Sequence, residues 1–475
     1  MNISIWSLLV GISTVWALAM TVVIVQQRRS PAATIAWLLV LTLLPIAGWV
    51  IYRLIGPLRL ERRKLRRRVT RKLVDEATGA LHEIESAAPT RHRDQLARVA
   101  IAAGEAPPLH AESVELYTEG MAKYGAIADA IDAARHHVHL EYYIWENDAI
   151  GRRLRDQLVD RARAGIEIRV LVDGTGSLGA RGRFFRPLID AGGQVAWFNP
   201  LSLLRIRRRR ADFRSHRKII VCDGRVGFTG GMNVADTETA EFSGSAAWRD
   251  THARFEGSAV RVLQRVFAED WLYATGSELP YGEVYFPVPT RDGSEIVQIV
   301  ASGPDLDVFA IQKMFFAAIN RAENRVWLTT PYFLPDDAIQ SALVSAAMRG
   351  LDVRVLAPAR SDSRLVDLAA RSYFPELLAA GARVFEYQPR FVHAKTFVID
   401  DDIAIIGTAN LDNRSFRLDF EVIAVVYGPT MNARLDAVFE ADLAHAREVR
   451  RDAMISQPFW TRFGQSGARL LSPLL

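Results

Sequence analysis

The sequence predicts an α/β protein built from two similar halves packed face to face, preceded by a two-helix transmembrane hairpin. Three observations lead to this fold class. The N-terminus contains two long uncharged runs, the remainder alternates β-rich and helical segments, and much of that remainder occurs twice. At 475 residues, the chain also exceeds the usual size of one domain.

The N-terminal segment has the composition of membrane helices. Ile3 to Val25 is an uncharged run of 23 residues, and Pro31 to Tyr52 is another of 22. About 20 apolar residues suffice to cross a bilayer as a helix. A cleaved signal peptide is the alternative, but it would carry a basic residue before the apolar run, and this sequence has none there. We therefore expect a transmembrane hairpin over residues 1–56.

Basic residues are concentrated directly after this segment. Between Arg53 and Lys72 there are ten Lys or Arg residues and one acidic residue, Glu61. The positive-inside rule then places everything after the second helix on the cytoplasmic side, and the same cations attract anionic lipid headgroups. Residues 1–72 carry a net charge of +11 against +5 for the whole chain, so the remainder is at −6. This acidic remainder argues against nucleic acid as a partner.

Composition divides the rest of the chain into three parts. Residues 57–108 are predicted to form a basic juxtamembrane segment and a linker, with one amphipathic helix around Arg91 to Ala103. Residues 109–290 and 291–475 are predicted to form the two α/β domains. The single cysteine, Cys222, excludes an intrachain disulfide, and we expect it to be a packed core thiol.

The two domains repeat the same segments in the same order. Matched positions are offset by 185, 189 and 177 residues in three successive segments, so the order is kept while the loops differ. Alternating β-rich and helical runs predict a largely parallel sheet. The elements expected in the first domain are a strand over 138–145, a helix over 148–164, a strand over 167–173 and a helix over 184–191.

The first domain also contains an insertion, Leu201 to Arg214, with the sequence RIRRRR. A basic run of this kind is usually a solvated loop. Its position directly before His216 equally favours a role in attracting an anionic substrate. The sequence leaves both interpretations open.

A short motif, His-x-Lys-x4-Asp, occurs at matched positions of the two domains. The chance expectation for one such match in this composition is only about 0.01, so two matches are not accidental. Lysine is rare here, since 53 of the 59 basic residues are arginine, yet both motifs contain it. An asparagine follows each histidine by seventeen residues, after glycines that permit a tight turn. The residues concerned are His216, Lys218, Asp223 and Asn233, and His393, Lys395, Asp400 and Asn410.

Paired histidines of this kind suit a two-step displacement at phosphorus. One neutral imidazole attacks as the nucleophile, and the other delivers a proton to the leaving oxygen. Lysine and asparagine supply donors to phosphoryl oxygens. Neither motif has a second histidine or a cysteine at metal-ligand spacing, and the chain has no Walker-type glycine loop, so we expect no metal and no cofactor.

The tandem motif, followed by GGMN and GTAN, resembles the phospholipase D superfamily. The N-terminal hairpin, HLEYYIWENDAIG, WRDTHARFEG and the terminal ARLLSPLL are similar to bacterial cardiolipin synthases of the two-helix type. The resemblance implies transfer of a phosphatidyl group between two phosphatidylglycerol molecules through a phosphohistidine, without metal. It also implies a multi-pass protein of the bacterial inner membrane.

The resemblance further assigns roles to individual residues. An acidic residue orients each histidine in this superfamily, and Glu421 and Asp250 occupy the matching positions. By analogy, His216 is the nucleophile and His393 the general acid and then base. Although Asp223 and Asp400 belong to the catalytic motifs, we expect them to hold backbone or contacts between the halves.

Three other functions share parts of this pattern. A phospholipase D hydrolase would use the same intermediate, because water and a glycerol hydroxyl attack it alike. A nuclease of the superfamily is disfavoured by the acidic remainder, and a catalytically inactive membrane scaffold by two intact motifs. The sequence does not decide the second lipid or alcohol substrate, the acyl-chain preference or the oligomeric state.

Overall fold

The computed structural model describes residues 5–27, 31–56, 91–200, 213–279, 282–289, 293–306, 308–388 and 390–473. The chain divides into two compact units. One comprises Met1–Glu61 and Leu201–Phe213, and the other comprises Arg62–Pro200 and Arg214–Leu475.

The described residues of the first unit form three helices where the sequence predicts two. They are α1 (Ile5–Val25), α2 (Pro31–Leu43) and α3 (Pro45–Ile55). The second apolar run is broken because Pro45 has no N–H to continue the helix and disfavours the helical conformation at Leu44, which adopts φ −129° and ψ 66°. Around the break, Ile24, Leu41 and Tyr52 form a small core.

The predicted transmembrane hairpin is not supported. In the described part of the chain, no helix combines the length and the apolar character that a bilayer crossing requires. The break at Pro45 leaves helices of 13 and 11 residues. These span only about 20 and 16 Å at 1.5 Å per residue, against a hydrocarbon core of about 30 Å. The predicted basic segment and the RIRRRR insertion lie almost entirely outside the described residues.

The first half of the second unit matches the predicted order of elements closely. Asp148 caps the helix that follows it by accepting a hydrogen bond from Gly151 N. Its elements are β1 (Leu109–Tyr117), α6 (Gly120–Ala133), β2 (His137–Tyr142), α7 (Ala149–Arg163), β3 (Glu167–Asp173), α8 (Arg186–Asp190), β4 (Gln194–Phe198), β5 (Ile219–Cys222), β6 (Val226–Gly230), α9 (Ala240–Ser243), β7 (His252–Gly257) and α10 (Ser258–Thr275), with α5 (Arg91–Ala102) before them.

The second half repeats this order and adds a helical C-terminus. Its elements are β8 (Glu295–Ser302), α11 (Ala310–Arg321), β9 (Arg325–Thr329), β10 (Phe333–Leu334), α12 (Asp337–Met348), β11 (Asp352–Pro358), α13 (Arg364–Arg371), α14 (Phe374–Ala380), β12 (Arg383–Tyr387), β13 (Thr396–Ile399), β14 (Ile403–Gly407), β15 (Leu411–Asp412), α15 (Asn413–Arg417), β16 (Glu421–Tyr427), α16 (Pro429–Leu443), β17 (Ala446–Glu448), α17 (Arg451–Ile455) and α18 (Phe459–Arg469).

The strands of both halves form one continuous sheet. Its order is β17-β12-β11-β9-β13-β14-β16-β8-β1-β7-β6-β5-β2-β3-β4, and the halves join where β1 and β8 pair antiparallel. The prediction of a largely parallel sheet is wrong. Among the described strands of this sheet, parallel pairing is confined to β2-β3-β4 and β9-β11-β12, whose successive strands are joined by helical crossovers, whereas β5-β6 and β13-β14 are hairpins.

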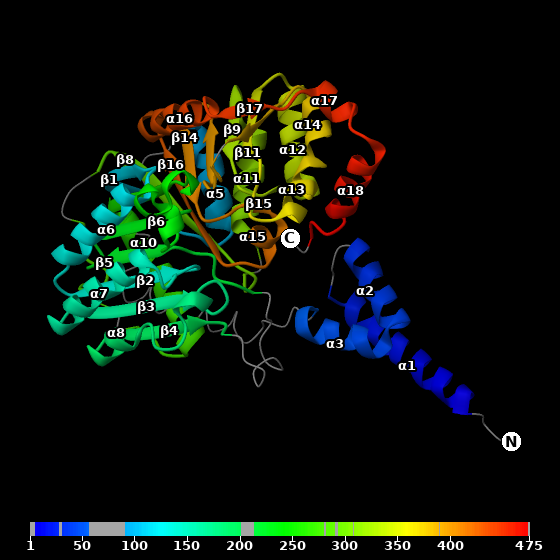
Figure 1. The fold of residues 1–475 in the computed structure, drawn as a ribbon, viewed down its shortest axis with the longest axis horizontal. Coiled ribbons are helices and arrows are strands. Elements are labelled where there is room, and N and C mark those ends of the chain that lie inside the picture. The colour runs from blue at the N-terminus through cyan, green and yellow to red at the C-terminus, as the bar shows by residue number, and fades with distance from the viewer. Residues whose placement is uncertain are drawn as a thin grey trace. The chain divides into compact units, whose positions relative to one another are not determined.

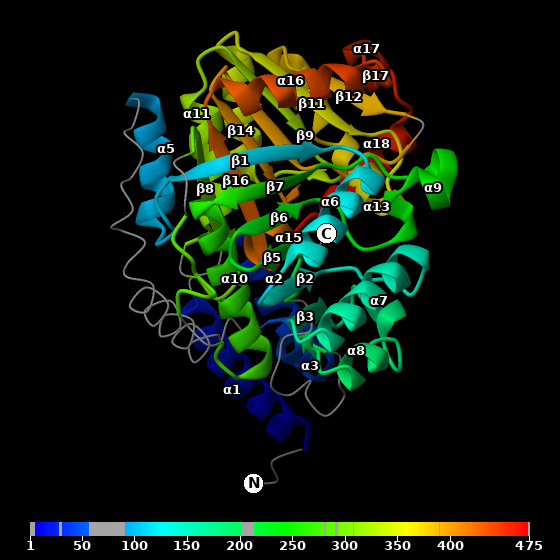
Figure 2. The same cartoon turned by 90° about the vertical axis from the view of Figure 1, so that its left-hand side faces the viewer.

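Helices cover the outer strands of each half, and the two halves share an inner core. Helices α6, α7 and α8 pack with β2 and β3, while α11, α12 and α14 pack with β9 and β11. Between these layers, β6 and β7 contact β14 and β16, and α10 and α16 complete an apolar core drawn from both halves. Figure 1 shows β1 beside β8 at this junction, and Figure 2 shows β1 beside β7.

Candidate active site

Both histidine-lysine pairs lie in extended chain just before a short buried hairpin strand. His216 and Lys218 precede β5, and His393 and Lys395 precede β13. In each pair the lysine Nζ donates a hydrogen bond to the backbone carbonyl of its own histidine, at 2.8 Å for Lys218. Because each lysine lies two positions after its histidine and bonds its carbonyl, the local backbone holds the lysine beside the histidine.

The segment before each hairpin strand pairs with the segment that precedes an acidic residue of the opposite half. His216 N donates to Phe420 O at 2.9 Å, and His393 N donates to Arg249 O at 2.7 Å. These contacts belong to two parallel bridges between the halves. Each bridge pairs the residue before a histidine with the residue before an acid of the opposite half. As a result, each histidine lies beside an acid that the opposite half contributes.

The orienting carboxylates therefore cross over between the halves. The Nδ1 atom of His216 lies 3.1 Å from Oε1 of Glu421, and Nδ1 of His393 lies 2.6 Å from Oδ2 of Asp250. Both carboxylate side chains are fully buried. A carboxylate at Nδ1 fixes the tautomer that leaves Nε2 available, and it stabilises the imidazolium cation. Neither histidine is oriented by the acid of its own half.

Arg217 adds a third connection between the halves, directly between His216 and Lys218. Its buried guanidinium donates to the backbone carbonyls of Glu421 and Ser302, both at 3.0 Å, and forms an ion pair with Asp270. These bonds tie the first motif to β16 and β8 of the second half. Arg217 thereby helps to hold His216 in register with Glu421.

Hydroxyl groups surround the carboxylate of Glu421. The Thr408 hydroxyl donates to Oε2, and the Ser415 hydroxyl donates to Oε1 at 2.8 Å. The matching position to Thr408 in the first half is Gly231. A Cβ there would lie 2.0 Å from Oδ1 of Asp250, so the Asp250 carboxylate occupies this space. The glycine is required by this close approach.

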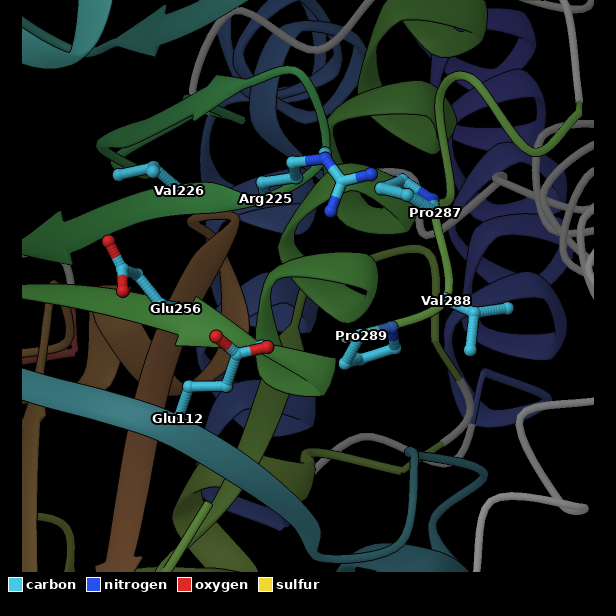
Figure 3. Close-up of a pocket in the computed structure, with 9 residues that line it drawn as sticks. Glu112, Arg225, Val226, Glu256, Pro287, Val288 and Pro289 are labelled. Atoms are coloured by element: carbon cyan, nitrogen blue, oxygen red, sulfur yellow. The ribbon is translucent and has the colours of Figure 1, made fainter. Parts of the chain in front are cut away.

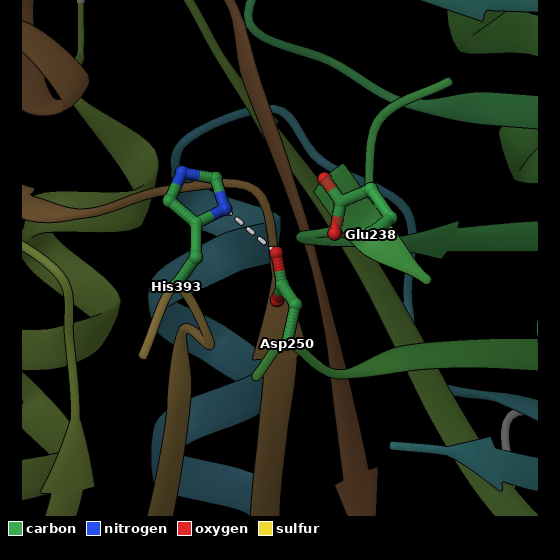
Figure 4. Close-up of side chains that lie close together, drawn as sticks. All are labelled: Glu238, Asp250 and His393. Carbon is green, nitrogen blue, oxygen red and sulfur yellow. Dashed lines mark hydrogen bonds and ion pairs between the residues drawn. The ribbon is translucent and has the colours of Figure 1, made fainter. Parts of the chain in front are cut away.

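The acid cluster on the other side contains one more carboxylate. Ligand atoms of Glu238, Asp250 and His393 all lie within 4.8 Å of one another (Figure 4). Among the described residues, this is a group with the geometry to hold a metal ion. However, Asp250 already accepts the hydrogen bond of His393, and the positive charges of Lys123 and Lys395 act on Glu238. The group therefore fits a buried hydrogen-bonded acid cluster better than a cation site.

Burial sets the charge states of the site. It lowers the pKa of Lys218 to about 8 and of Lys395 to about 7, against the opposing pull of nearby carboxylates. Burial, reinforced by the lysines, also lowers the pKa of both histidines well below the usual value. Neutral imidazoles beside lysines are the form that a nucleophile requires.

The asparagines belong to the same crossed networks. Asn233 N donates to Oε1 of Glu238 at 2.8 Å, which connects it to the cluster around His393. Asn410 N donates to the hydroxyl of Ser415 at 3.0 Å, which in turn bonds Glu421. The side-chain oxygen of Asn410 is buried and has no hydrogen-bond partner in the part of the chain that the structure describes.

The motif aspartates lie at the opposite ends of their strands from the histidines. Asp223 accepts hydrogen bonds from the backbone N–H groups of residues 135–137, and Asp400 accepts those of residues 323–325. Both adopt positive φ, at 54° and 47°. Their carboxylates fix the turns before β2 and β9, which agrees with the expectation that these two motif residues hold backbone.

Sequence reasoning missed several buried residues of the site, including Glu238, Thr408 and Ser415. It also missed Lys123, whose Nζ donates to Asn233 O at 3.0 Å and whose side chain is fully buried. A signal for Lys123 was present, because it is one of six lysines in an arginine-rich chain. For Glu238 the sequence offers no comparable signal.

A separate pocket of about 300 Å³ lies beyond Asp223, where β5 ends (Figure 3). Its lining includes Glu112, Arg225 and Glu256 together with Pro287 and Pro289. None of the candidate catalytic side chains lines it. The pocket is therefore distinct from the histidine-lysine site.

Comparisons with known proteins agree with this geometry. The chain matches the family described as "Cardiolipin synthase, PLD-like domain" over residues 127–271 and 315–443, and the family described as "Phospholipase_D-nuclease N-terminal" over residues 14–57. It is 38% identical to cardiolipin synthase 1 of Bacillus anthracis, over 100% of this chain and 96% of that protein. It is also 38% identical to the major cardiolipin synthase ClsA of Bacillus subtilis (strain 168), over 96% of each.

A solved structure has the same fold at low sequence identity. Phosphatidylserine synthase of Haemophilus influenzae Rd KW20 superposes with a TM-score of 0.62 at 13% identity, over 80% of this chain and 100% of that one. The fold and the paired site define a phospholipase D-like enzyme. From the family match and the full-length relatives, the chain belongs to the bacterial cardiolipin synthase family of this superfamily.

Proposed function

We propose that this protein is a phosphatidyltransferase that makes cardiolipin and glycerol from two molecules of phosphatidylglycerol. The observation that carries the proposal is the crossed pairing of two histidines with carboxylates of opposite halves, with a lysine beside each histidine. Two equivalent imidazoles are suited to a double displacement, in which one group is replaced by a chemically similar one. The relatives named cardiolipin synthase support this choice over hydrolysis.

In the first step, Nε2 of His216 attacks the phosphorus of one phosphatidylglycerol. A nitrogen–phosphorus bond forms while the bond from phosphorus to the glycerol headgroup oxygen breaks. The bound phosphodiester anion raises the pKa of His393, and the resulting imidazolium gives its Nε2 proton to that oxygen, so that glycerol leaves. The shorter contact to the acid, 2.6 Å for His393 against 3.1 Å for His216, supports His393 as the proton carrier.

In the second step, the headgroup hydroxyl of another phosphatidylglycerol attacks the phosphohistidine. Neutral His393 takes its proton, a new oxygen–phosphorus bond forms, and His216 is released unchanged. One phosphodiester has replaced another, so the balance of bonds requires no nucleotide and no oxidant. The same site hydrolyses the intermediate only if water replaces the second lipid.

Lysine cations of the chain neutralise the negative charge on the phosphoryl oxygens. Lys218 and Lys395 are buried beside the histidines, and a bound phosphodiester anion raises the pKa of each lysine back toward its usual range. Asn233 and Asn410 supply neutral donors to the same oxygens. This donor set supports phosphoryl chemistry carried out by protein groups.

We further propose that the enzyme acts at the cytoplasmic face of the bacterial inner membrane. The ten basic residues between Arg53 and Lys72 support contact with anionic lipid, since each cation near such a surface contributes roughly 1 kcal/mol. The acidic character of the remaining chain supports lipid over nucleic acid as the partner.

The test uses purified full-length protein with phosphatidylglycerol as its sole lipid, in the presence of a chelator. We expect cardiolipin and free glycerol in equal amounts, and the loss of both products in His216→Asn. Phosphatidic acid as the main lipid product would identify a hydrolase instead. Activity that required added metal would contradict the chemistry proposed for the lysines.

A further inference from the structure

The C-terminal helix α18, red in Figure 1, presents a cluster of aromatic rings to solvent. Phe459, Trp460 and Phe463 are 60%, 76% and 61% exposed, and we call these three side chains the aromatic surface. Their ring centroids lie 5.1 to 6.0 Å apart, so the rings form one continuous patch. At 150–250 Å² per ring, roughly 300–500 Å² of aromatic area is exposed, the size at which patches mark interaction sites.

The opposite face of α18 is firmly packed, so the exposed rings are not the result of a frayed end. Ala468 is 4% exposed and belongs to the core of the second half, and Gln465 is 5% exposed. The Arg469 guanidinium stacks over the ring of Tyr373, 4.3 Å from its centroid. The fold therefore holds this helix in place and directs its aromatic residues outward.

Positive charge surrounds the aromatic surface. Arg450, Arg451, Arg462 and Arg469 are all exposed, and Asp452 is the single acidic residue between positions 450 and 473. This segment is thus at +3, although the chain after residue 72 is at −6. Exposed aromatic rings flanked by arginine characterise helices that lie in the headgroup layer of an anionic bilayer.

We propose that α18 docks on an anionic phospholipid bilayer, with Phe459, Trp460 and Phe463 inserted at the headgroup boundary. The choice of an anionic bilayer as the partner rests on the proposed function, whose substrate is an anionic lipid. The arginines on the same segment are attracted to the negatively charged bilayer surface. The aromatic rings favour the boundary between the headgroups and the acyl chains. Docking keeps the catalytic body at the surface that contains its substrate.

Insertion is measured by a fluorophore attached to the aromatic surface. The chain has one cysteine, Cys222, which is 2% exposed, so an introduced surface cysteine is labelled selectively. An environment-sensitive dye on Phe463→Cys is compared with the same dye on Ile189→Cys, an exposed position of α8. We expect a blue shift at position 463 on adding phosphatidylglycerol vesicles, quenching by lipids brominated near the headgroup, and neither effect at position 189.

Two results of this experiment would overturn the proposal. One is an unchanged spectrum at position 463 on adding vesicles. The other is a shift that appears without lipid as protein concentration rises, which would identify a second copy of the chain as the partner. Neither readout needs catalytic activity, so failure here is distinguishable from failure of the proposed function.

A second measurement uses Phe459→Ser/Trp460→Ser/Phe463→Ser. On vesicles of long-chain phosphatidylglycerol, we expect cardiolipin formation at least 10-fold slower than in the unaltered protein. On short-chain phosphatidylglycerol dissolved as monomers, we expect equal rates, because no surface is involved. Equal loss on both substrates would contradict a docking role.

Discussion

The crossed carboxylates make a prediction that separates the two histidines. Asp250→Asn removes the negative charge that lies 2.6 Å from Nδ1 of His393 and leaves the side-chain volume nearly unchanged. The imidazolium of His393 loses its stabilising partner, so its pKa falls and less of it is protonated at neutral pH. Release of glycerol, the step that needs this proton, is expected to slow.

The size of the effect follows from the burial of the pair. Both side chains are nearly inaccessible, at 5% for His393 and 0% for Asp250, so solvent does not screen the bond. A hydrogen bond to a charged partner contributes about 1.5–3 kcal/mol. At 1.36 kcal/mol per factor of ten, the rate of glycerol release should fall about 10- to 200-fold.

The assay compares two substrates that differ in the leaving group. With phosphatidylglycerol, Asp250→Asn and Glu421→Gln should both be slow. With a phosphatidyl ester whose leaving group departs as a stable anion, only Asp250→Asn should recover, because protonation by His393 is no longer needed. Recovery of Glu421→Gln instead would show that His216 is the acid and would refute the assignment.

A matched control shows whether the loss reflects chemistry or folding. Asp223→Asn makes the same change at a carboxylate that holds only backbone N–H groups of residues 135–137. It should lower the thermal unfolding temperature with little effect on the rate for the folded fraction. If both variants lost activity equally, a catalytic effect of Asp250 through His393 would be excluded.

Two further predictions concern charge. Lys395→Arg keeps the cation but puts a broader planar group at a residue that is 4% exposed, so turnover should fall by about 100-fold. The control, Lys313→Arg on the exposed side of α11, should have no effect on turnover. Full activity of Lys395→Arg would refute the requirement for lysine. Activity against pH should be bell-shaped. Burial raises the pKa of Glu421 to about 7, so its carboxylate is lost below that pH. Burial lowers the pKa of Lys395 to about 7 and that of Lys218 to about 8, so these cations are lost above those values. A kcat/KM that stayed flat from pH 6 to 9 would contradict both charge requirements.

Much of the site was predictable because its chemistry is encoded in short spacings. A single residue separates each histidine from its lysine, so local backbone alone brings them together, as the hydrogen bonds from Lys218 and Lys395 show. The fold class was predictable for a similar reason, since alternation and repetition are properties of the chain itself. The parallel character of the sheet was overestimated because hairpin strands and helix-linked strands look alike in the sequence.

The N-terminal apolar segment shows how a single residue can alter a prediction based on composition. Apolar content over Pro31 to Tyr52 predicted one long helix, and Pro45 divides it. The proline was visible in the sequence, but its effect depends on whether neighbouring groups supply the missing hydrogen bonds. Composition averages over a window and cannot represent this local backbone constraint.

The sequence by itself determined that two histidine-lysine pairs and two orienting acids exist. Only the tertiary structure decided which acid serves which histidine. Asp250 lies 143 residues from His393, and Glu421 lies 205 residues from His216. Contacts over such separations depend on how the halves pack, here through parallel bridges that place each motif beside the acid of the other half. Glu238 and Lys123 also join the site without any local motif, because contacts within the first half, such as that of Lys123 Nζ with Asn233 O across 110 residues, form only when the chain folds.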